Sequence, residues 1–119
     1  MKATVHEGMR TPWGKADSAE MLCYGIGTVG TPSHGGIKLD RKHNSLIPEY
    51  MRQDGGWYEE DCDWAIPFCV FEMEIYNRGN CDKYVFKSIT ENQHRECLMH
   101  WHTAAFNKYY GQQVEIRDN

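Results

Sequence analysis

The sequence lacks the charge pattern of proteins that bind nucleic acids without sequence preference. Thirteen Lys and Arg stand against seventeen Asp and Glu, and the formal net charge is −4. Non-specific binding of DNA or RNA depends on a basic surface that neutralises phosphates, so this charge disfavours a general nucleic-acid binder. It is also too small and too mixed in sign for a polyanion that mimics DNA.

Long hydrophobic runs are missing as well. No segment approaches the roughly 18 apolar residues that a membrane span needs, and the first residues, MKATVHEGMRTPWG, contain no apolar core of a signal peptide. The cysteines show no CxxC spacing and are odd in number (Cys23, Cys62, Cys69, Cys81 and Cys97). This pattern favours reduced thiols. We therefore expect a protein of the host-cell cytoplasm that does not enter a membrane.

What the chain does contain is enough apolar material for one modest core. It has 119 residues, of which 40% are hydrophobic and 13% aromatic. These values predict a single domain over residues 1–119, with a core at about 11–111 and short loose termini.

The first half of the chain predicts a small antiparallel sheet. Met21 to Val29 is rich in β-branched residues and is followed by the turn signal Thr31-Pro32, and Ile37 to Leu39 alternates as a second strand. Asp40 is placed to cap a short helix through RKHNSLI. Pro48 suits the first turn of a further helical stretch, which Asp54-Gly55-Gly56 ends.

The second half predicts two main helices. The first runs from Trp57 to Tyr76, with a kink or a division into two pieces at Pro67. The second begins at the capping box of Ser88 and Glu91 and ends at Gly111, before a tail that forms a brief edge strand or stays loose. Its core face is predicted from the helical period: Leu98, Trp101, Ala105 and Tyr109. The predicted fold class is α+β, a small sheet packed against two helices.

The segment GGWYEEDCDWA, residues 55–65, allows two interpretations. As the start of a helix, its carboxylates would occupy the first turn and interact with the positive end of the helix dipole. As a site, one of Glu59, Glu60 and Asp61 would face a pocket lined by Trp57 and Tyr58 and act as an acid, a base or a ligand contact.

The turn TPSHGG is the natural counterpart of that segment. Ser33 and His34 lie beside the glycine pair Gly35-Gly36, which allows close approach of a ligand. Ser33, His34 and Gly35 are therefore candidate ligand contacts. Ser33 and His34 are adjacent and point to opposite faces of an extended chain, so they make a poor catalytic pair. His34 with a carboxylate of Glu59, Glu60 or Asp61 is the better constellation, and a glycine turn with a polar rim remains the alternative.

The segment HRECLMHWH has the composition of a zinc site. One helix cannot direct His94, Cys97, His100 and His102 to a single ion, because His100 lies about 120° from His94 around the axis. His94 with Cys97, or Cys97 with His100, gives two weak candidate ligands, and Asp61, Cys62 and His34 are the further candidates. No cofactor is predicted.

Five motifs in unbroken order resemble an uncharacterised domain family found in phages and bacterial plasmids. They are TPWGKA, TPSHGGIKL, the N-x-x-x-P-x-Y-M-R pattern from Asn44, GGWYEEDCDWA and LMHWHTAAFNKYYG, and they span about residues 11–111. The resemblance implies a gene carried by a mobile element. It implies no activity, cofactor or catalytic residue.

Two functional expectations follow. The first is a small phage or mobile-element accessory protein that acts by binding, inhibiting a bacterial defence component or sequestering its ligand; its partner is a host protein or a small nucleotide-like molecule. The alternative is a small hydrolase or nucleotide-processing enzyme that uses His34 with Glu59, Glu60 or Asp61.

Overall fold

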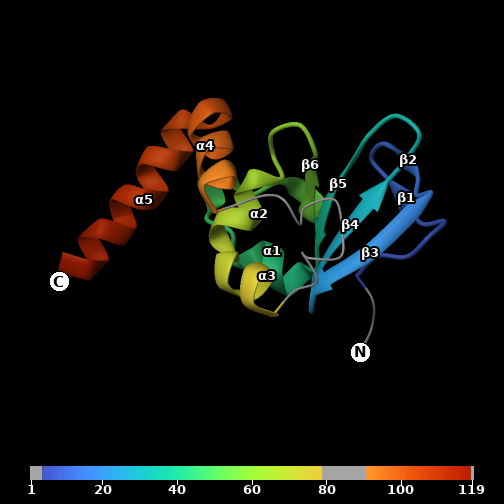
Figure 1. The fold of residues 1–119 in the computed structure, drawn as a ribbon, viewed down its shortest axis with the longest axis horizontal. Helices are drawn as coiled ribbons and strands as arrows, with labels where there is room; N and C mark the ends of the chain where they lie inside the picture. The colour runs from blue at the N-terminus through green and yellow to red at the C-terminus, as the bar shows by residue number, and fades with distance from the viewer. Residues whose placement is uncertain (1–3, 79–90, 119) are drawn as a thin grey trace.

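A four-stranded antiparallel sheet, in the order β3-β4-β5-β6, forms one side of the protein, next to the short helices (Figure 1). The structure, a computed structural model, describes residues 4–78 and 91–118. The strands are β1 (Arg10–Thr11) and β2 (Gly14–Lys15), which form a separate hairpin, and β3 (Ser18–Cys23), β4 (Ile26–Gly30), β5 (Gly35–Leu39) and β6 (Trp57–Glu59). The helices are α1 (Arg41–Leu46), α2 (Ala65–Val70), α3 (Glu72–Arg78), α4 (Glu91–Trp101) and α5 (Thr103–Asp118), with 3-10 turns η1 (Glu49–Met51) and η2 (Asp54–Gly56). The predicted α+β class is confirmed.

The prediction of one strand from Met21 to Val29 is wrong, because the chain reverses within it. Strands β3 and β4 pair antiparallel on either side of Tyr24-Gly25. Gly25 has φ of 78°, and a Cβ there would clash with the His43 ring. Only glycine adopts this conformation readily, so Gly25 makes the turn. The predicted antiparallel pairing with the following strand is confirmed, with Ile26 opposite Leu39 and Thr28 opposite Ile37.

The predicted cap and turns after β5 are present. The Asp40 carboxylate accepts a hydrogen bond from the backbone N–H of His43 at 2.8 Å and so caps α1. Pro48 precedes the single turn of η1. Asp54, Gly55 and Gly56 form η2, which leads directly into β6.

The prediction that Trp57 begins a helix is wrong. Residues Trp57–Glu59 form β6 and pair with β5, with Gly36 opposite Glu59 and Lys38 opposite Trp57. The first helix of this segment starts only at Ala65. The carboxylates of residues 59–63 therefore precede the helix, and the helix-start interpretation of this segment fails.

The interruption of the apolar helix is confirmed, although it falls after Pro67. Helix α2 ends at Val70, and Phe71 has φ of −107° and ψ of 34° before α3 begins. Pro67 lies in the first turn of α2, where a missing N–H removes no hydrogen bond within the helix. The chain breaks where α2 meets α3.

The last predicted helix is two helices that meet at His102. Gly111 does not end it, since α5 continues to Asp118 and includes the tail predicted as a strand or a loose end. Leu98 is fully buried, but Trp101 is 60% exposed, which contradicts its assignment to the core. The predicted cap residue Ser88 lies outside the described residues.

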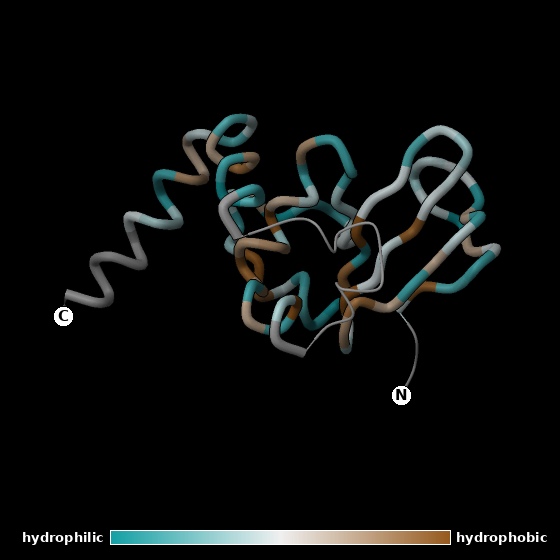
Figure 2. Tube along the Cα trace, viewed as in Figure 1, coloured by the Kyte–Doolittle hydropathy of each residue, from teal (hydrophilic) through white to brown (hydrophobic). Residues whose placement is uncertain are grey.

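The sheet is covered on both faces. Apolar side chains of one face pack against the helices, among them Ile37, Leu39 and Tyr58. On the opposite face, Val29 packs with Val5 and Ala16, and Trp13 and Trp57 lie against this smaller cluster. Figure 2 shows the hydrophobic residues gathered between the sheet and the short helices, with α5 extending away from them. Over the described residues, no helix has both the length and the apolar character that crossing a membrane requires.

Candidate functional site

The sheet register brings His34 and Glu59 together. Gly36 of β5 lies opposite Glu59 of β6, so the turn before β5 and the end of β6 meet at one end of the sheet. His34 Nδ1 lies 3.7 Å from Glu59 Oε1. Asp61 joins them, because the candidate ligand atoms of His34, Glu59 and Asp61 all lie within 4.8 Å of one another.

The surroundings of Glu59 favour its protonated form. Burial raises the pKa of this carboxyl, and the charge of Asp61 raises it further, although the backbone N–H of Asp61 donates to Glu59 Oε2 at 3.1 Å and opposes the shift. The His34 side chain is 50% exposed and that of Glu59 is 24% exposed. The pair therefore lies at the surface, where it can exchange protons with solvent.

A tight turn holds the His34 backbone in place. The backbone N–H of Thr31 donates to the carbonyl of His34 at 2.7 Å, and the Thr31 hydroxyl donates to the same carbonyl at 2.6 Å. Gly35 fits closely, since a Cβ there would meet the Val29 carbonyl, and its own carbonyl accepts from the Glu60 N–H at 2.9 Å. Ser33 is exposed in this turn.

Trp57 and Tyr58 do not line one pocket beside His34. Neighbouring residues of a strand point to opposite faces, and Tyr58 is fully buried among the residues packed on the helices. Its hydroxyl donates to Asn44 Oδ1 at 2.5 Å and accepts from the Gln53 N–H at 3.1 Å. Trp57 packs at 5.7 Å against Trp13 on the other face. Glu60 is exposed, and its carboxylate is not part of the group that His34 forms with Glu59 and Asp61.

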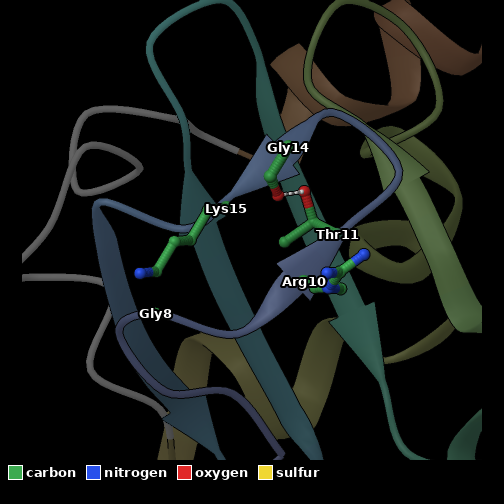
Figure 3. Close-up of a pocket in the computed structure, with 5 residues that line it drawn as sticks. All are labelled: Gly8, Arg10, Thr11, Gly14 and Lys15. Carbon is green, nitrogen blue, oxygen red and sulfur yellow. Dashed lines mark hydrogen bonds between the residues drawn. The ribbon is translucent and has the colours of Figure 1, made fainter.

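Two cavities in the described residues lie away from this pair. The larger, of about 450 Å³, is lined by Gly8, Arg10, Thr11, Gly14 and Lys15 of the β1–β2 hairpin (Figure 3). Figure 3 shows the Lys15 side chain extending away from Arg10. The second, of about 240 Å³, is lined by Lys38, Leu39, Arg41, Asn44 and Gly55.

His94, a weak zinc candidate, has a structural role. It is fully buried. Its Nε2 lies 2.7 Å from Glu72 Oε1 and its Nδ1 lies 3.2 Å from the Tyr76 hydroxyl, so both ring nitrogens engage α3. Arg95 Nη2 binds the same carboxylate at 3.0 Å. This network fastens α4 to α3 and leaves no ring nitrogen for a metal.

The other candidate ligands of the HRECLMHWH segment do not lie together. The Cys97 thiol donates to the Cys62 carbonyl at 3.8 Å, whereas His100 packs edge-on against exposed Trp101 at 4.7 Å. His102 Nε2 lies 2.9 Å from Asp63 Oδ1. Sequence reasoning missed this last contact because 39 positions separate the two residues and no local spacing connects them.

Burial raises the pKa of the thiols near this contact. The pKa of Cys62 rises to about 11, chiefly through burial and then through the charge of Asp63. Burial and Asp63 also raise the pKa of Cys97. Both cysteines are therefore neutral thiols near pH 7, which makes them poor nucleophiles.

Comparison with known proteins assigns the chain to a family without assigning an activity. The profile of a domain of unknown function (DUF7007) matches residues 6–119. A comparison with curated proteins and another with solved structures gave no match. Because the match covers nearly the whole chain, the protein belongs to this domain family of unknown function.

Proposed function

We propose that this protein acts by binding another protein, through a surface centred on Trp101 at the end of α4. The observation that carries the proposal is the 60% exposure of this side chain. Tryptophan is the residue most enriched among those that dominate binding energy at protein interfaces. The exposure of so large an apolar side chain is explained if a partner protein covers it in the complex.

The neighbour His100 supports this use. His100 packs edge-on against the indole with an interplanar angle of 89°. That contact limits the motion of the free side chain, so less conformational entropy is lost on binding.

The partner that this proposal favours is a host protein. The motifs shared with domains of phages and plasmids lead us to propose a bacterial defence component, which a bound accessory protein would inhibit. The mildly acidic charge of −4 fits a protein partner better than a nucleic acid.

Capture from host lysate with the purified, tagged protein tests this proposal. The wild type should retain one host protein in fixed stoichiometry, measured by native mass spectrometry. Trp101→Ala should weaken the purified complex by at least about 30-fold, as expected for a dominant interface residue worth about 2 kcal/mol. Tyr24→Ala is the matched control, since Tyr24 is 59% exposed at the β3–β4 turn and should bind normally. Equal binding by the Trp101 variant would refute this surface.

A second candidate function is acid–base catalysis by His34 and Glu59. The observation that favours it is the 3.7 Å separation of His34 Nδ1 and Glu59 Oε1 together with the raised pKa of Glu59. A carboxyl that keeps its proton nearer to neutral pH is the better general acid. The pair would act on a substrate bound at the open end of the sheet, such as a nucleotide.

Turnover of a panel of nucleotides and phosphate esters tests the enzyme proposal. If the pair is catalytic, wild-type activity should fall by about 100-fold or more in both His34→Gln and Glu59→Gln, within the usual range for a lost acid or base. Glu49→Gln, which changes an exposed carboxylate of η1, should retain full activity. Activity that survives in both site variants would exclude the pair.

A further inference from the structure

Cys62, Asp63 and His102 form a compact cluster of three different metal-binding groups. Cys62 Sγ, Asp63 Oδ1 and His102 Nε2 all lie within 4.8 Å of one another. The two residues of the turn before α2 thus meet the residue that separates α4 from α5. None of these three residues belongs to the His34–Glu59 pair or to the surface around Trp101.

The separation of Cys62 and Asp63 matches that of two ligands around one ion, and the separation of Asp63 and His102 is shorter. Ligands bound to a tetrahedral zinc at about 2.0–2.3 Å lie roughly 3.3–3.8 Å apart. Here Cys62 Sγ lies 3.6 Å from Asp63 Oδ1, and His102 Nε2 lies 2.9 Å from the same oxygen. Small side-chain rotations would therefore place all three atoms around a common centre.

The hydrogen bonds of the cluster point to the same centre. Asp63 Oδ1 faces both the thiol of Cys62 and the Nε2 atom of His102. A cation between the three groups would replace the protons that now lie between them. Sulfur, nitrogen and oxygen together are ligands for zinc, whereas Mg²⁺ and Ca²⁺ prefer oxygen alone.

We propose that Cys62, Asp63 and His102 bind one Zn²⁺ ion. Three protein ligands leave the fourth tetrahedral position to solvent, and the side chains of His102 and Asp63 are 26% and 24% exposed, so water can reach it. The ion would tie the turn at residues 62–63 to the junction of α4 and α5. Cys97, whose thiol donates to the Cys62 carbonyl, lies beside the site outside this ligand set.

Titration of the metal-free protein with Co²⁺, followed by displacement with Zn²⁺, tests the proposal. One equivalent of Co²⁺ should produce the thiolate-to-cobalt charge-transfer absorption that reports a sulfur ligand, and Zn²⁺ should remove it. Cys62→Ser should abolish this absorption, and both Cys62→Ser and His102→Gln should lower Zn²⁺ affinity by more than about 100-fold, since loss of a ligand exceeds the 10–100-fold effect of an outer-shell change.

Two control variants keep the test decisive. Cys23→Ser, at a half-buried cysteine of β3, should leave the absorption and the affinity unchanged. Glu59→Gln should leave the absorption in place, because Glu59 acts on Cys62 only through its charge and belongs to the separate cluster of His34, Glu59 and Asp61. Far-ultraviolet circular dichroism of each variant reports whether it is folded. Binding that survives in Cys62→Ser, is lost in Glu59→Gln, or is absent from the wild type would overturn the proposal.

Discussion

At the residue scale, the hydroxyl of Tyr58 connects the sheet to the turns that follow α1. The side chain is fully buried, yet its hydroxyl both donates to Asn44 and accepts from the backbone N–H of Gln53. Asn44 in turn donates to the Gln53 carbonyl at 3.0 Å. A buried polar group is tolerated when each of its partners is satisfied, so this tyrosine is a structural residue.

Tyr58→Phe should therefore destabilise the protein. The substitution leaves the N–H of Gln53 and Oδ1 of Asn44 without this partner, and such losses lower the free energy of unfolding by about 1–3 kcal/mol. Denaturant unfolding measures the change. Tyr24→Phe, at a tyrosine that is 59% exposed, should stay within about 0.5 kcal/mol of the wild type; an equally small effect at Tyr58 would contradict this role.

The cap of α1 should make stability depend on pH. Burial opposes ionisation of Asp40, but the hydrogen bonds from the backbone and the ring of His43 outweigh it and hold the pKa of Asp40 below its ordinary value. The ionised carboxylate therefore stabilises the fold above the unfolded-state pKa, and this contribution is lost as pH falls through the folded-state pKa.

Asp40→Asn isolates this contribution, because asparagine still caps a helix but carries no charge. The wild type should exceed the variant in free energy of unfolding by up to about 1 kcal/mol near neutral pH. The difference should narrow below about pH 4. Denaturant unfolding at several pH values measures it. A difference that widens toward acid pH would show that the carboxylate does not act through its charge.

At the element scale, the junction of α4 and α5 decides which residues face the core. Helix α4 is fastened to α3 by the contacts of His94 and Arg95 with Glu72. Helix α5 then extends away from the body of the protein (Figure 1), and along it Lys108 Nζ lies 4.5 Å from the centre of the Tyr50 ring. Leu98 of α4 is buried, whereas Trp101, the last residue of the same helix, is 60% exposed.

The Gly111→Ala substitution tests whether this glycine lies inside a helix or ends one, because protein stability changes in opposite directions in the two cases. Gly111 lies inside α5, and a Cβ there would have open space. Gly111→Ala should therefore stabilise the protein by about 0.5–1 kcal/mol, as expected in a helix interior. A glycine that ended the helix in the left-handed conformation would give the opposite sign. Thermal and denaturant unfolding decide between them, with Gly25→Ala, at φ of 78°, as the destabilised reference.

At the scale of the whole molecule, the two faces of the sheet are unequally covered. The helix side contains most of the fully buried side chains, including Ile37, Leu39, Ile66 and Phe68. The other side is covered by the N-terminal segment, and among the described residues its buried cluster comprises Val5, Ala16 and Val29. Local openings follow the amount of buried apolar contact, so the N-terminal layer should open at lower free energy than the centre of the sheet.

Amide hydrogen exchange measures this difference. The backbone amides of β4 and β5 should exchange only through global unfolding, because these central strands pair on both sides. Amides of the two-residue strands β1 and β2 should exchange faster by at least about tenfold, corresponding to about 1.4 kcal/mol. Equal protection of the hairpin and the central strands would show that the N-terminal layer unfolds together with the rest.

Several local features were predictable from sequence because local chemistry determines them. The Asp40 cap needs only a carboxylate before a helix, and the alternating strand at Ile37 to Leu39 needs only a period of two. The β3–β4 turn was also predictable from the sequence, since Gly25 between two apolar stretches is a turn signal. The prediction joined these stretches because both favour strand.

The strand identity of Trp57–Glu59 was not predictable from its own residues. Aromatic and acidic residues before an apolar run also suit a helix start, and only pairing with β5 makes this segment extended. That pairing places Glu59 beside His34. The chemistry of the two residues predicts that they lie together, whereas the distance between them and their exposed position depend on the sheet register.

The sequence by itself determined the α+β class, the family, the Asp40 cap and the turn at Asp54-Gly55-Gly56, because these depend on composition, motif order and contacts between near neighbours. Only the tertiary structure decided which distant residues meet: Asp63 with His102, His94 with Glu72, and Trp101 with solvent. Such contacts depend on where one chain segment ends and the next turns. They join parts of the chain that are far apart in the sequence, so no local pattern records them.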